Sequence, residues 1–572
     1  MYPREAHGLL PGISDTETQA VTPGDDLEVL VDDKTSWEYP MAQLRSLQTK
    51  IHTPNPKNPG YIRQKANDKL WVHERIATFL DKGSFEEIGS ISGKPSKPGD
   101  LEDFVPANCV MGWGKVRNRK VFVTADDFSV RGGHADGGIQ RKAGYGENLA
   151  RRARVPLIRL LDGSSGGGSV ATYLSIGATY IPGLAGLGQS MDAMAVIPVA
   201  SALVGPVVGL AAAKTVVGHF SVMVKGLSQL FAAGPPVVRG ATFEDLSKES
   251  LGGWEIHCTN GTVDNVAISE QDAYEQIRKF LSYLPSSIFA LPPVKMTGDR
   301  RDRREEALIR IIPRRRTSPY DIRRLIELVV DKNAEGGSTF FEIGETWGKN
   351  IVIGFARLEG RPMGVLSSDC KSNGGAIDAF GCQKTARFVN LCDHFGLPIL
   401  NLVDQPGFAV GSIAEKMATI RHGASAMAAL YNAVVPIFTI IIRRAFGVAG
   451  GAFANPDGDD WGKRVAWPSG DWGSLPLEGG IEAAYKRQLD AASTPEKREE
   501  LMNDLLGKFE QVRNPMRTAH SFGVEEIIDP RDTRPLACEW VVHAYAHVLP
   551  QIVTLRQARF GFDIKPSKSY KL

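Results

Sequence analysis

The chain has 572 residues, of which 42% are hydrophobic and 23% are charged, and its formal net charge is +2. This length and apolar content allow two to four domains with substantial cores. The near-balanced charge excludes a protein that relies on a global basic or acidic field to bind nucleic acid or membrane. The six cysteines are too widely spaced for a Cys-x-x-Cys pair, so the sequence predicts no disulfide framework and no metal site.

Residues 1–69 are predicted to form an extension that precedes the first domain. The first 40 residues include nine acidic side chains and lack the apolar stretch of a signal peptide, a composition that is atypical of mitochondrial presequences. We therefore expect a cytoplasmic protein, with a mitochondrial or peroxisomal location left open. The extension itself is expected to be either disordered or packed onto the first domain.

An internal repeat follows the extension. The segments RVPLIRLLDG (154–163) and GLPILNLVDQ (396–405) align at one ungapped offset of 242 residues. The same offset pairs Gly132-Gly133 with Gly374-Gly375, Lys142 with Lys384, Gly205 with Gly447 and Gly209 with Gly451. This repeat predicts two copies of one unit, at 70–297 and 320–560, followed by a tail at 561–572. We interpret the arginine-rich segment 298–319 as a solvated connector that can dock on an acidic neighbour, the alternatives being a nuclear signal or a nucleic-acid patch.

Each copy is predicted to contain the same order of elements. In the first copy, a hairpin at 115–128 precedes a helix at 140–154, a buried strand at 155–161, a glycine-rich turn, a second buried strand and a helix that begins near Gly205. The second copy has strands at 397–403 and 434–442 and a helix that begins near Gly447. Alternating helices and apolar strands indicate an α/β fold with largely parallel pairing.

One apolar segment is long enough to span a bilayer. Residues 193–213 carry no charge over 21 positions, but Pro198, Gly205 and Pro206 interrupt them. These interruptions favour a strand, a tight turn and a buried helix over a membrane span.

The stretch LLDGSSGGGSVATY (160–173) places three consecutive glycines after a strand, yet it lacks the lysine of a P-loop and the spacing of a Rossmann fingerprint. Each copy combines a strand end, small residues and a helix start in two places. These are Gly166-Gly167-Gly168 and Gly205 to Gly209 in the first copy, and Gly407 to Gly411 and Gly447-Val448-Ala449-Gly450-Gly451 in the second. Unpaired N–H groups at a helix start bind a negative oxygen, so the pattern predicts oxyanion holes, the alternative being close packing of helix on strand.

Several longer motifs carry a specific resemblance. The run VDQPGFAVGSIAEKMATIRHGA (403–424), together with DDFSVRGGH (126–134) and KTARFVNLCDHFGLPI (384–399), resembles the carboxyltransferase subunit of biotin-dependent acyl-CoA carboxylases, of the propionyl-CoA carboxylase beta type. The resemblance covers roughly residues 70–560. It implies two tandem crotonase-like (ββα spiral) domains related by internal duplication, the first holding acyl-CoA and the second holding carboxybiotin.

The resemblance also implies roles for particular residues. The amides of Gly166, Gly167 and Gly168 would hold the thioester oxygen, and those of Val448 and Ala449, beside Gly447, would hold the ureido oxygen of biotin. Other residues expected on the substrate side are Gly132, Gly133, Gly205, Gly209, Arg141 and Lys142, with the two basic side chains near the anionic CoA. On the biotin side we expect Gly407, Phe408, Gly450 and Gly451.

The partners follow from what the chain does not show. No A-M-K-M biotinylation motif is visible, the nearest string being Val294-Lys295-Met296, and no ATP-binding module is evident. Biotin is therefore expected on a partner chain with biotin carboxylase activity, and the resemblance implies a homo-oligomer, a hexamer. The family's D-S-G-G-A-R loop reads Gly163 to Ser169 here, without the arginine. This departure leaves open which acyl-CoA is used, and a decarboxylase component or a non-catalytic scaffold with decayed sites are the alternatives.

Overall fold

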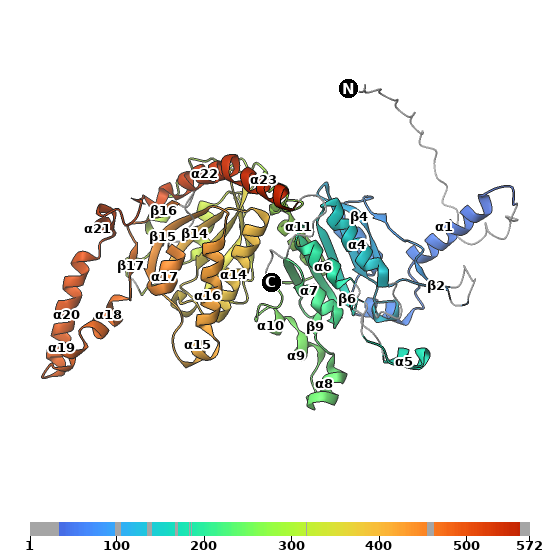
Figure 1. The fold of residues 1–572 in the computed structure, drawn as a ribbon, viewed down its shortest axis with the longest axis horizontal. Coiled ribbons are helices and arrows are strands. Elements are labelled where there is room, and N and C mark those ends of the chain that lie inside the picture. Colours follow the sequence, from blue (N-terminus) through green and yellow to red (C-terminus); the bar gives the residue numbers. More distant parts are fainter. Residues whose placement is uncertain are drawn as a thin grey trace, which may run out of the picture.

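The structure is a computed structural model that describes residues 34–95, 97, 104–133, 140–165, 170–181, 184, 186–315, 317–454 and 463–560. It forms two lobes side by side, each built around one mixed sheet with helices packed on it (Figure 1). The strand order of the first sheet is β1-β4-β5-β6-β7-β8-β10, and that of the second is β11-β12-β13-β14-β15-β16-β18. In each sheet one further strand, β9 or β17, pairs with the fifth strand, β7 or β15.

The elements of the first lobe have the following bounds. The strands are β1 (Glu86–Glu87), β2 (Gly93–Pro95), β3 (Phe104–Pro106), β4 (Cys109–Val116), β5 (Arg119–Asp126), β6 (Leu157–Gly163), β7 (Val199–Val208), β8 (Phe220–Val224), β9 (Gln229–Phe231) and β10 (Asn265–Ala267). The helices are α1 (Glu38–His52), α2 (Pro59–Ala66), α3 (Val72–Phe79), η1 (Arg131–Gly133), α4 (Gln140–Ala153), α5 (Ala171–Ile176), α6 (Leu187–Met194), α7 (Leu210–Val216), α8 (Pro235–Thr242), α9 (Lys248–Gly252), α10 (Trp254–His257) and α11 (Glu270–Tyr283).

The second lobe follows a short connecting helix, α12 (Leu308–Ile311). Its strands are β11 (Phe341–Ile343), β12 (Ile351–Leu358), β13 (Arg361–Ser368), β14 (Ile399–Gln405), β15 (Ile437–Phe446), β16 (Lys463–Ala466), β17 (Asp471–Gly473) and β18 (Glu526–Ile527). Its helices are α13 (Ile322–Val329), η3 (Asn373–Gly375), α14 (Ala379–Phe395), α15 (Ser412–Lys416), α16 (Thr419–Asn432), α17 (Gly447–Ala454), α18 (Leu477–Ala484), α19 (Lys486–Asp490), α20 (Pro495–Val512), α21 (Pro515–His520), η4 (Pro530–Asp532), α22 (Thr533–His543), η5 (Ala544–Val548) and α23 (Leu549–Phe560).

The predicted repeat is confirmed, but the offset between the two copies changes between their fourth and fifth strands. Strands β4, β5 and β6 match β12, β13 and β14 at the offset read from the sequence. In the next pairing, Leu157 lies opposite Val199 whereas Ile399 lies opposite Ile437, so the connection between these strands is four residues shorter in the second copy. The structural counterpart of Gly447 is therefore Gly209, and the predicted pairing of Gly205 with Gly447 is wrong.

The helix predicted to begin near Gly205 begins instead at Leu210. Strand β7 continues through Gly205 and Pro206 because the register jumps there, with Leu161 opposite Leu203 and then Gly163 opposite Val207. A bulge tolerates a proline, which has no N–H to give to the strand ladder. The apolar segment around these residues is thus a strand and a short helix. No helix in the described part of the chain has the length and apolar character needed to cross a bilayer.

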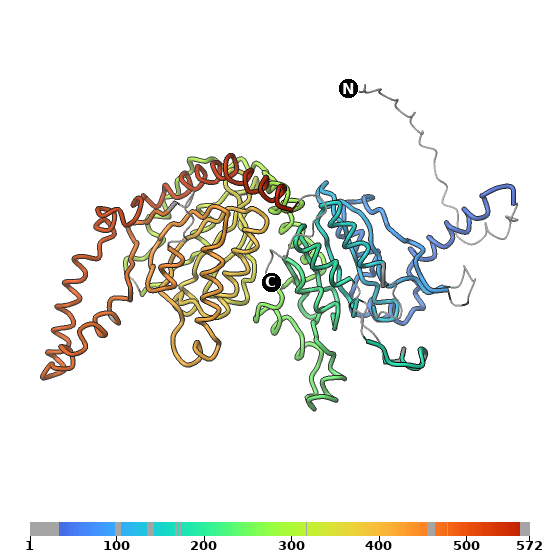
Figure 2. The backbone as a smooth tube through the Cα atoms, in the orientation of Figure 1, coloured from blue at the N-terminus to red at the C-terminus, as the bar shows by residue number. Residues whose placement is uncertain are grey.

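The two lobes share one apolar core. The rings of Phe220 and Phe280 stack with their centroids 4.7 Å apart, and Phe280 lies 5.9 Å from Phe355 of the second lobe. Figure 2 shows the C-terminal helices running over the second lobe towards the first, where Gln557 Nε2 donates to the Phe289 carbonyl at 3.2 Å. Burial of shared aromatic rings explains why the lobes pack as one body.

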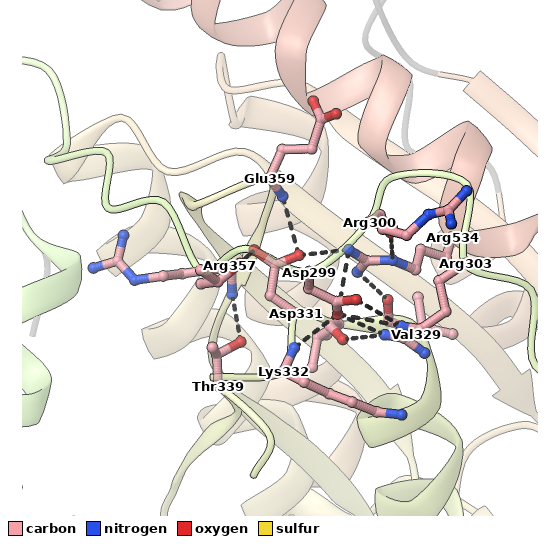
Figure 3. Close-up of polar contacts among 12 residues, drawn as sticks. Asp299, Arg300, Arg303, Val329, Asp331, Lys332, Thr339, Arg357, Glu359 and Arg534 are labelled. Atoms are coloured by element: carbon pink, nitrogen blue, oxygen red, sulfur yellow. Dashed lines mark hydrogen bonds and ion pairs between the residues drawn. The ribbon is translucent and has the colours of Figure 1, made fainter. Parts of the chain in front are cut away.

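The arginine-rich connector is docked on the second lobe (Figure 3). Arg303 binds Asp299 and donates to the carbonyls of Leu328 and Val330. Arg534, buried in α22, pairs with Asp331 at 2.9 Å and with Asp299 at 3.4 Å. Arg304 of the connector pairs with Asp532 of the second lobe at 2.7 Å, an acidic neighbour of the kind that the docked-connector interpretation expects.

Candidate active site

The candidate site of the second lobe lies where β14 and β15 end and α17 begins. Gly447 has a φ of 63°, in the left-handed region that favours glycine, and turns the chain from β15 into the helix. The first N–H groups of a helix have no partner within it, and among the described residues the amides of Val448 and Ala449 have no other hydrogen-bond partner, so they can serve as donors. The Val448 side chain is 67% exposed and that of Ala449 is buried. This helix start therefore faces solvent with donors for an oxyanion.

The other predicted small residues of α17 differ in what they do. A Cβ atom at Gly450 would lie 2.5 Å from the carbonyl carbon of Ala445, so Gly450 is needed for the close packing of α17 on β15. A Cβ atom at Gly451 would meet nothing within 4 Å. The packing interpretation thus explains Gly450 but not Gly447, whose left-handed turn sets the start of the helix.

Gly407 and Phe408 follow β14. A Cβ atom at Gly407 would lie 3.8 Å from the carbonyl oxygen of Phe446, so the structure brings Gly407 beside the residue that precedes Gly447. The Phe408 ring packs beneath α16, where a Cβ atom at Gly423 would come within 2.6 Å of it. Gly407 therefore borders the start of α17, whereas the Phe408 ring supports α16.

The first lobe repeats this arrangement at the start of α7. Gly209 has a φ of 62°, almost equal to that of Gly447, and follows β7 as Gly447 follows β15. The amides equivalent to those of Val448 and Ala449 are therefore those of Leu210 and Ala211. The family's C-A-G-G-A motif places Leu210 and Ala211 around the first helix start, but sequence reasoning did not assign their amides as donors, because the one ungapped offset matches them to the wrong partners. An alignment that allowed a four-residue gap before the second buried strand would have found them.

The predicted donors Gly166, Gly167 and Gly168 lie outside the described residues, but the base of their loop is described. The loop leaves β6 after Gly163, next to η1. A Cβ atom at Gly133 would lie 2.7 Å from the Asp162 carbonyl oxygen, and a Cβ atom at Gly163 would lie 2.5 Å from that of Gly132. Gly132 and Gly133 thus permit a close approach of η1 to the point where the glycine loop begins.

Asp126, at the end of β5, holds the same loop base. Its carboxylate accepts hydrogen bonds from the Ser165 hydroxyl and from the Asp162 backbone N–H, the latter at 3.2 Å. Burial raises the pKa of Asp126 to about 6, against the hydrogen bonds from Ser165 and Asp162, which favour ionisation. The sequence analysis did not single out Asp126, because its position beside the loop follows from the parallel pairing of β5 with β6.

A buried ion-pair cluster lies behind the loop. Asp162 pairs with Lys69 at 2.7 Å and with Arg75 of α3 at 2.8 Å. Gly205 leaves room for this cluster, since a Cβ atom there would lie 2.0 Å from Asp162 Oδ1 and 2.4 Å from Lys69 Nζ. Gly205, predicted on the substrate side, is therefore a spacer for buried charges and not part of the helix start.

The counterpart of Asp162 is Asp404, which is also fully buried. It pairs with Arg443 at 3.1 Å and with Arg444 at 2.6 Å, and it accepts a hydrogen bond from the Tyr320 hydroxyl. Burial opposes its ionisation, but the hydrogen bonds and charges of the two arginines prevail and hold the pKa of Asp404 below its ordinary value. Both strands that feed the candidate site thus end in a carboxylate fixed by cations.

The predicted CoA-binding basic residues lie in α4. Lys142 is buried and its Nζ donates to the Gly89 carbonyl at 2.9 Å. Its counterpart Lys384 is fully buried and donates to the carbonyls of Gly344, Trp347 and Ile351. Lys142 therefore occupies an internal structural position that the repeat duplicates, turned away from solvent. Arg141 lies in the first turn of α4, and its side chain is outside the described residues.

Comparison with known proteins matches this architecture to one family. A model of the carboxyl transferase domain matches residues 63–547. The carboxyltransferase subunit of propionyl-CoA carboxylase from Haloferax mediterranei is 33% identical over 483 residues, covering 82% of this chain and 89% of its own. The alpha subunit of methylmalonyl-CoA decarboxylase from Veillonella parvula is 31% identical over 481 residues, covering 83% of this chain and 89% of its own.

A solved structure agrees with both the sequence match and the fold. The hexameric transcarboxylase 12S, with methylmalonyl-CoA and methylmalonic acid bound, superposes with a TM-score of 0.77 at 27% identity, covering 89% of this chain and 96% of its own. The predicted pair of tandem crotonase-like domains is confirmed by this match and by the duplicated sheets. The chain belongs to the carboxyl transferase domain family.

Proposed function

We propose that this protein is the carboxyltransferase subunit of a biotin-dependent acyl-CoA carboxylase. It would move a carboxyl group from carboxybiotin, held by a partner chain, to the α-carbon of a short acyl-CoA. The observation that carries the proposal is the duplicated helix start: α7 and α17 begin after equivalent left-handed glycines at the ends of equivalent strands. Two such starts suit a reaction in which two carbonyl-type oxygens gain negative charge. Family membership and the relatives described above support the assignment.

In the first lobe, backbone amides would hold the thioester oxygen of acyl-CoA. We assign this role to the amides of Leu210 and Ala211, together with the loop at Gly166, Gly167 and Gly168. Removal of the α-proton converts the thioester to an enolate, whose oxygen binds N–H donors more strongly than the neutral carbonyl does. Loss of one such donor typically lowers the rate by about 10²–10³-fold.

In the second lobe, the start of α17 fits a ureido ring. Carboxybiotin would supply the carboxyl group and, once this is released, a base for the α-proton. The amides of Val448 and Ala449 would donate to the ureido oxygen. Gly407 and Gly447 both have positive φ and no side chain, so a ring can approach the backbone here, and the exposed Val448 side chain offers an apolar contact.

A decarboxylase component is the second candidate. The similarity to a methylmalonyl-CoA decarboxylase subunit favours it, because the same two oxyanion sites serve the reaction in either direction. The partner chains set the direction: a biotin carboxylase would drive carboxylation, and a membrane pump would draw on decarboxylation.

We further propose a homo-oligomer, a hexamer, in which the first lobe of one copy faces the second lobe of another. Large apolar side chains lie exposed near the glycine loop of the first lobe and near α15 of the second lobe. Leu174 and Ile181 beyond the glycine loop, Val410 just before α15 and Ile413 within α15 are all at least 75% exposed. Exposed apolar patches of this kind mark surfaces that associate.

The experiment uses carboxyl-labelled methylmalonyl-CoA as donor and free biotin as acceptor, so that no partner chain is required. We expect label on biotin with the purified protein, and a biotinylated chain when the native complex is isolated. Calorimetry measures acyl-CoA affinity in parallel. Normal acyl-CoA binding without any transfer would contradict the proposed activity and leave a non-catalytic scaffold.

A further inference from the structure

Three potential metal ligands converge away from the candidate active site. His52 is the last residue of α1, His73 lies in the first turn of α3, and Glu87 ends β1. One ligand atom from each lies within 4.8 Å of the other two. His52 Nε2 and Glu87 Oε2 are 2.7 Å apart, and the rings of His52 and His73 meet edge to face with centroids 4.9 Å apart.

We propose that His52, His73 and Glu87 form a site for a divalent transition metal, Zn²⁺ above all, which fastens α1 to the first lobe. Zinc binds histidine nitrogens at about 2.0–2.1 Å and carboxylate oxygens at about 2.0–2.2 Å, in tetrahedral sites that water can complete. Bonds of this length place ligand atoms about 3.4 Å apart, so closure requires a movement of about 1 Å. His52 can supply it, because its side chain is 42% exposed and lies at the end of a helix.

The three groups are available for a metal. Within the part of the chain that the structure describes, no hydrogen bond reaches the His73 ring, which packs between Trp71 and His52. The Glu87 side chain is only 9% exposed and binds His52, a contact that the metal would replace.

The attachment of α1 explains what such a site would do. Ile51 is the one buried residue of the helix, so little apolar surface holds α1 to the lobe. A side-chain contact between Gln48 and Ser90 at 3.4 Å adds little. A metal bound by the end of α1 and by two elements of the lobe would supply the missing fastening. The ammonium of Lys142 opposes a second cation nearby, so we expect weaker binding than at cysteine-rich zinc sites.

The proposal also revises the sequence analysis, which predicted no metal site. Cysteine spacing guided that prediction, whereas this set contains no cysteine. The ligands are separated by 20 and 13 residues in the chain and meet only because α1 folds back onto α3 and β1. No local motif announces such a site.

The test uses the full-length protein after treatment with a chelator. Zinc is titrated against a chromophoric chelator, Co²⁺ is added in place of zinc to report four-coordinate geometry from its visible absorption, and hydrogen exchange follows the amides of α1. We expect one zinc per chain at this site and slower exchange in α1. His73→Ala should weaken the affinity by at least about 10–100-fold, the loss typical even of outer-shell changes, while leaving the contact between His52 and Glu87 intact.

His547→Ala is the matched control, because His543 and His547 form another close histidine pair, with ring centroids 4.6 Å apart. Retained affinity in His547→Ala with loss in His73→Ala supports the proposal. The opposite pattern, six-coordinate Co²⁺ alone, or α1 exchange that zinc leaves unchanged would overturn it. Thermal unfolding of each metal-free variant confirms that the protein remains folded, and none of the three metal readouts depends on carboxyl transfer.

Discussion

Replacing Lys384 by methionine should destabilise the protein far more than the same change at Lys142. The Nζ atom of Lys384 donates to three carbonyls, at 2.7, 3.1 and 2.7 Å, and the side chain is fully buried. Methionine is one atom shorter and removes all three hydrogen bonds. The Gly344 carbonyl keeps the Trp347 N–H at 3.3 Å, whereas the carbonyls of Trp347 and Ile351 lose this donor. Each unpaired buried carbonyl costs about 1–3 kcal/mol, so two of them give an expected loss of about 2–6 kcal/mol. Lys142 donates only to the Gly89 carbonyl, which also accepts from the Ser92 N–H at 3.1 Å, so the expected loss is that of one hydrogen bond, about 0.5–1.5 kcal/mol.

Urea denaturation followed by tryptophan fluorescence and circular dichroism measures both losses. Lys142 and Lys384 occupy equivalent positions in the two copies of the unit. The ratio of the two losses of stability therefore tests whether the number of hydrogen bonds lost decides the cost. A Lys384→Met protein as stable as the wild type would refute the reasoning. A loss at Lys142 equal to that at Lys384 would show that the number of acceptors does not decide the cost.

The same variant decides between two interpretations of Lys142. The sequence predicts that its charge attracts CoA, whereas the structure gives it an internal carbonyl partner. Lys142→Met should therefore leave acyl-CoA affinity unchanged at low salt, measured by calorimetry on the folded protein. Weaker acyl-CoA binding by the variant than by the wild type at low salt, with no difference at high salt, would place Lys142 in the binding site again, because salt screens the attraction between exposed charges.

Three further changes probe the site. Ala449→Pro removes one backbone N–H in the first turn of α17, where proline is tolerated. It should lower the rate of carboxyl transfer by about 10²–10³-fold and leave acyl-CoA affinity unchanged. Gly451→Ala is the control in the transfer assay, because it keeps every backbone N–H and its added methyl group meets nothing within 4 Å. Gly205→Ala would place a methyl group 2.0 Å from Asp162 Oδ1, so thermal unfolding should reveal a marked loss of stability, and an unchanged midpoint would contradict the packing. Asp126 has a pKa raised from 3.8 to about 6, so it stabilises the fold below pH 4 and loses about 3 kcal/mol as the pH rises through 6. Asp126→Asn should remove this fall in the free energy of unfolding between about pH 4 and pH 6, measured by denaturation at a series of pH values. A free energy of unfolding that falls more steeply with pH in the variant would contradict the predicted direction.

Local signals predicted the elements that local chemistry determines. The hairpin between β4 and β5 is one, because Arg117 and Asn118 form its two-residue turn with φ values of 50° and 65°, the conformation that matches strand twist. The start of α17 is another, since Gly447 was identified as the point where strand becomes helix. In both cases the residues that form the turn lie next to one another in the sequence.

The elements that sequence analysis placed wrongly depend on distant contacts. Gly205 and Pro206 resemble a turn, but β7 continues through them because β6 and β9 pair on either side. The shorter connection in the second copy shifts the counterparts in β15 and at the start of α17 by four residues, which no single motif reveals. Arg75 and Asp162, 87 residues apart, likewise form a pair that only the fold brings together.

The two copies reach the same arrangement by exchanging a cation for a glycine. At the bulge of the fifth strand, the first copy has Gly205 and imports Arg75 from a helix to neutralise Asp162. The second copy has Arg443 at the equivalent position, so the cation for Asp404 comes from the strand itself. A buried carboxylate without a cation costs several kcal/mol, so neither change could persist without the other. The strand ends that position both helix starts thus share one geometry while their surroundings differ, which suits the two proposed sites for two different ligands.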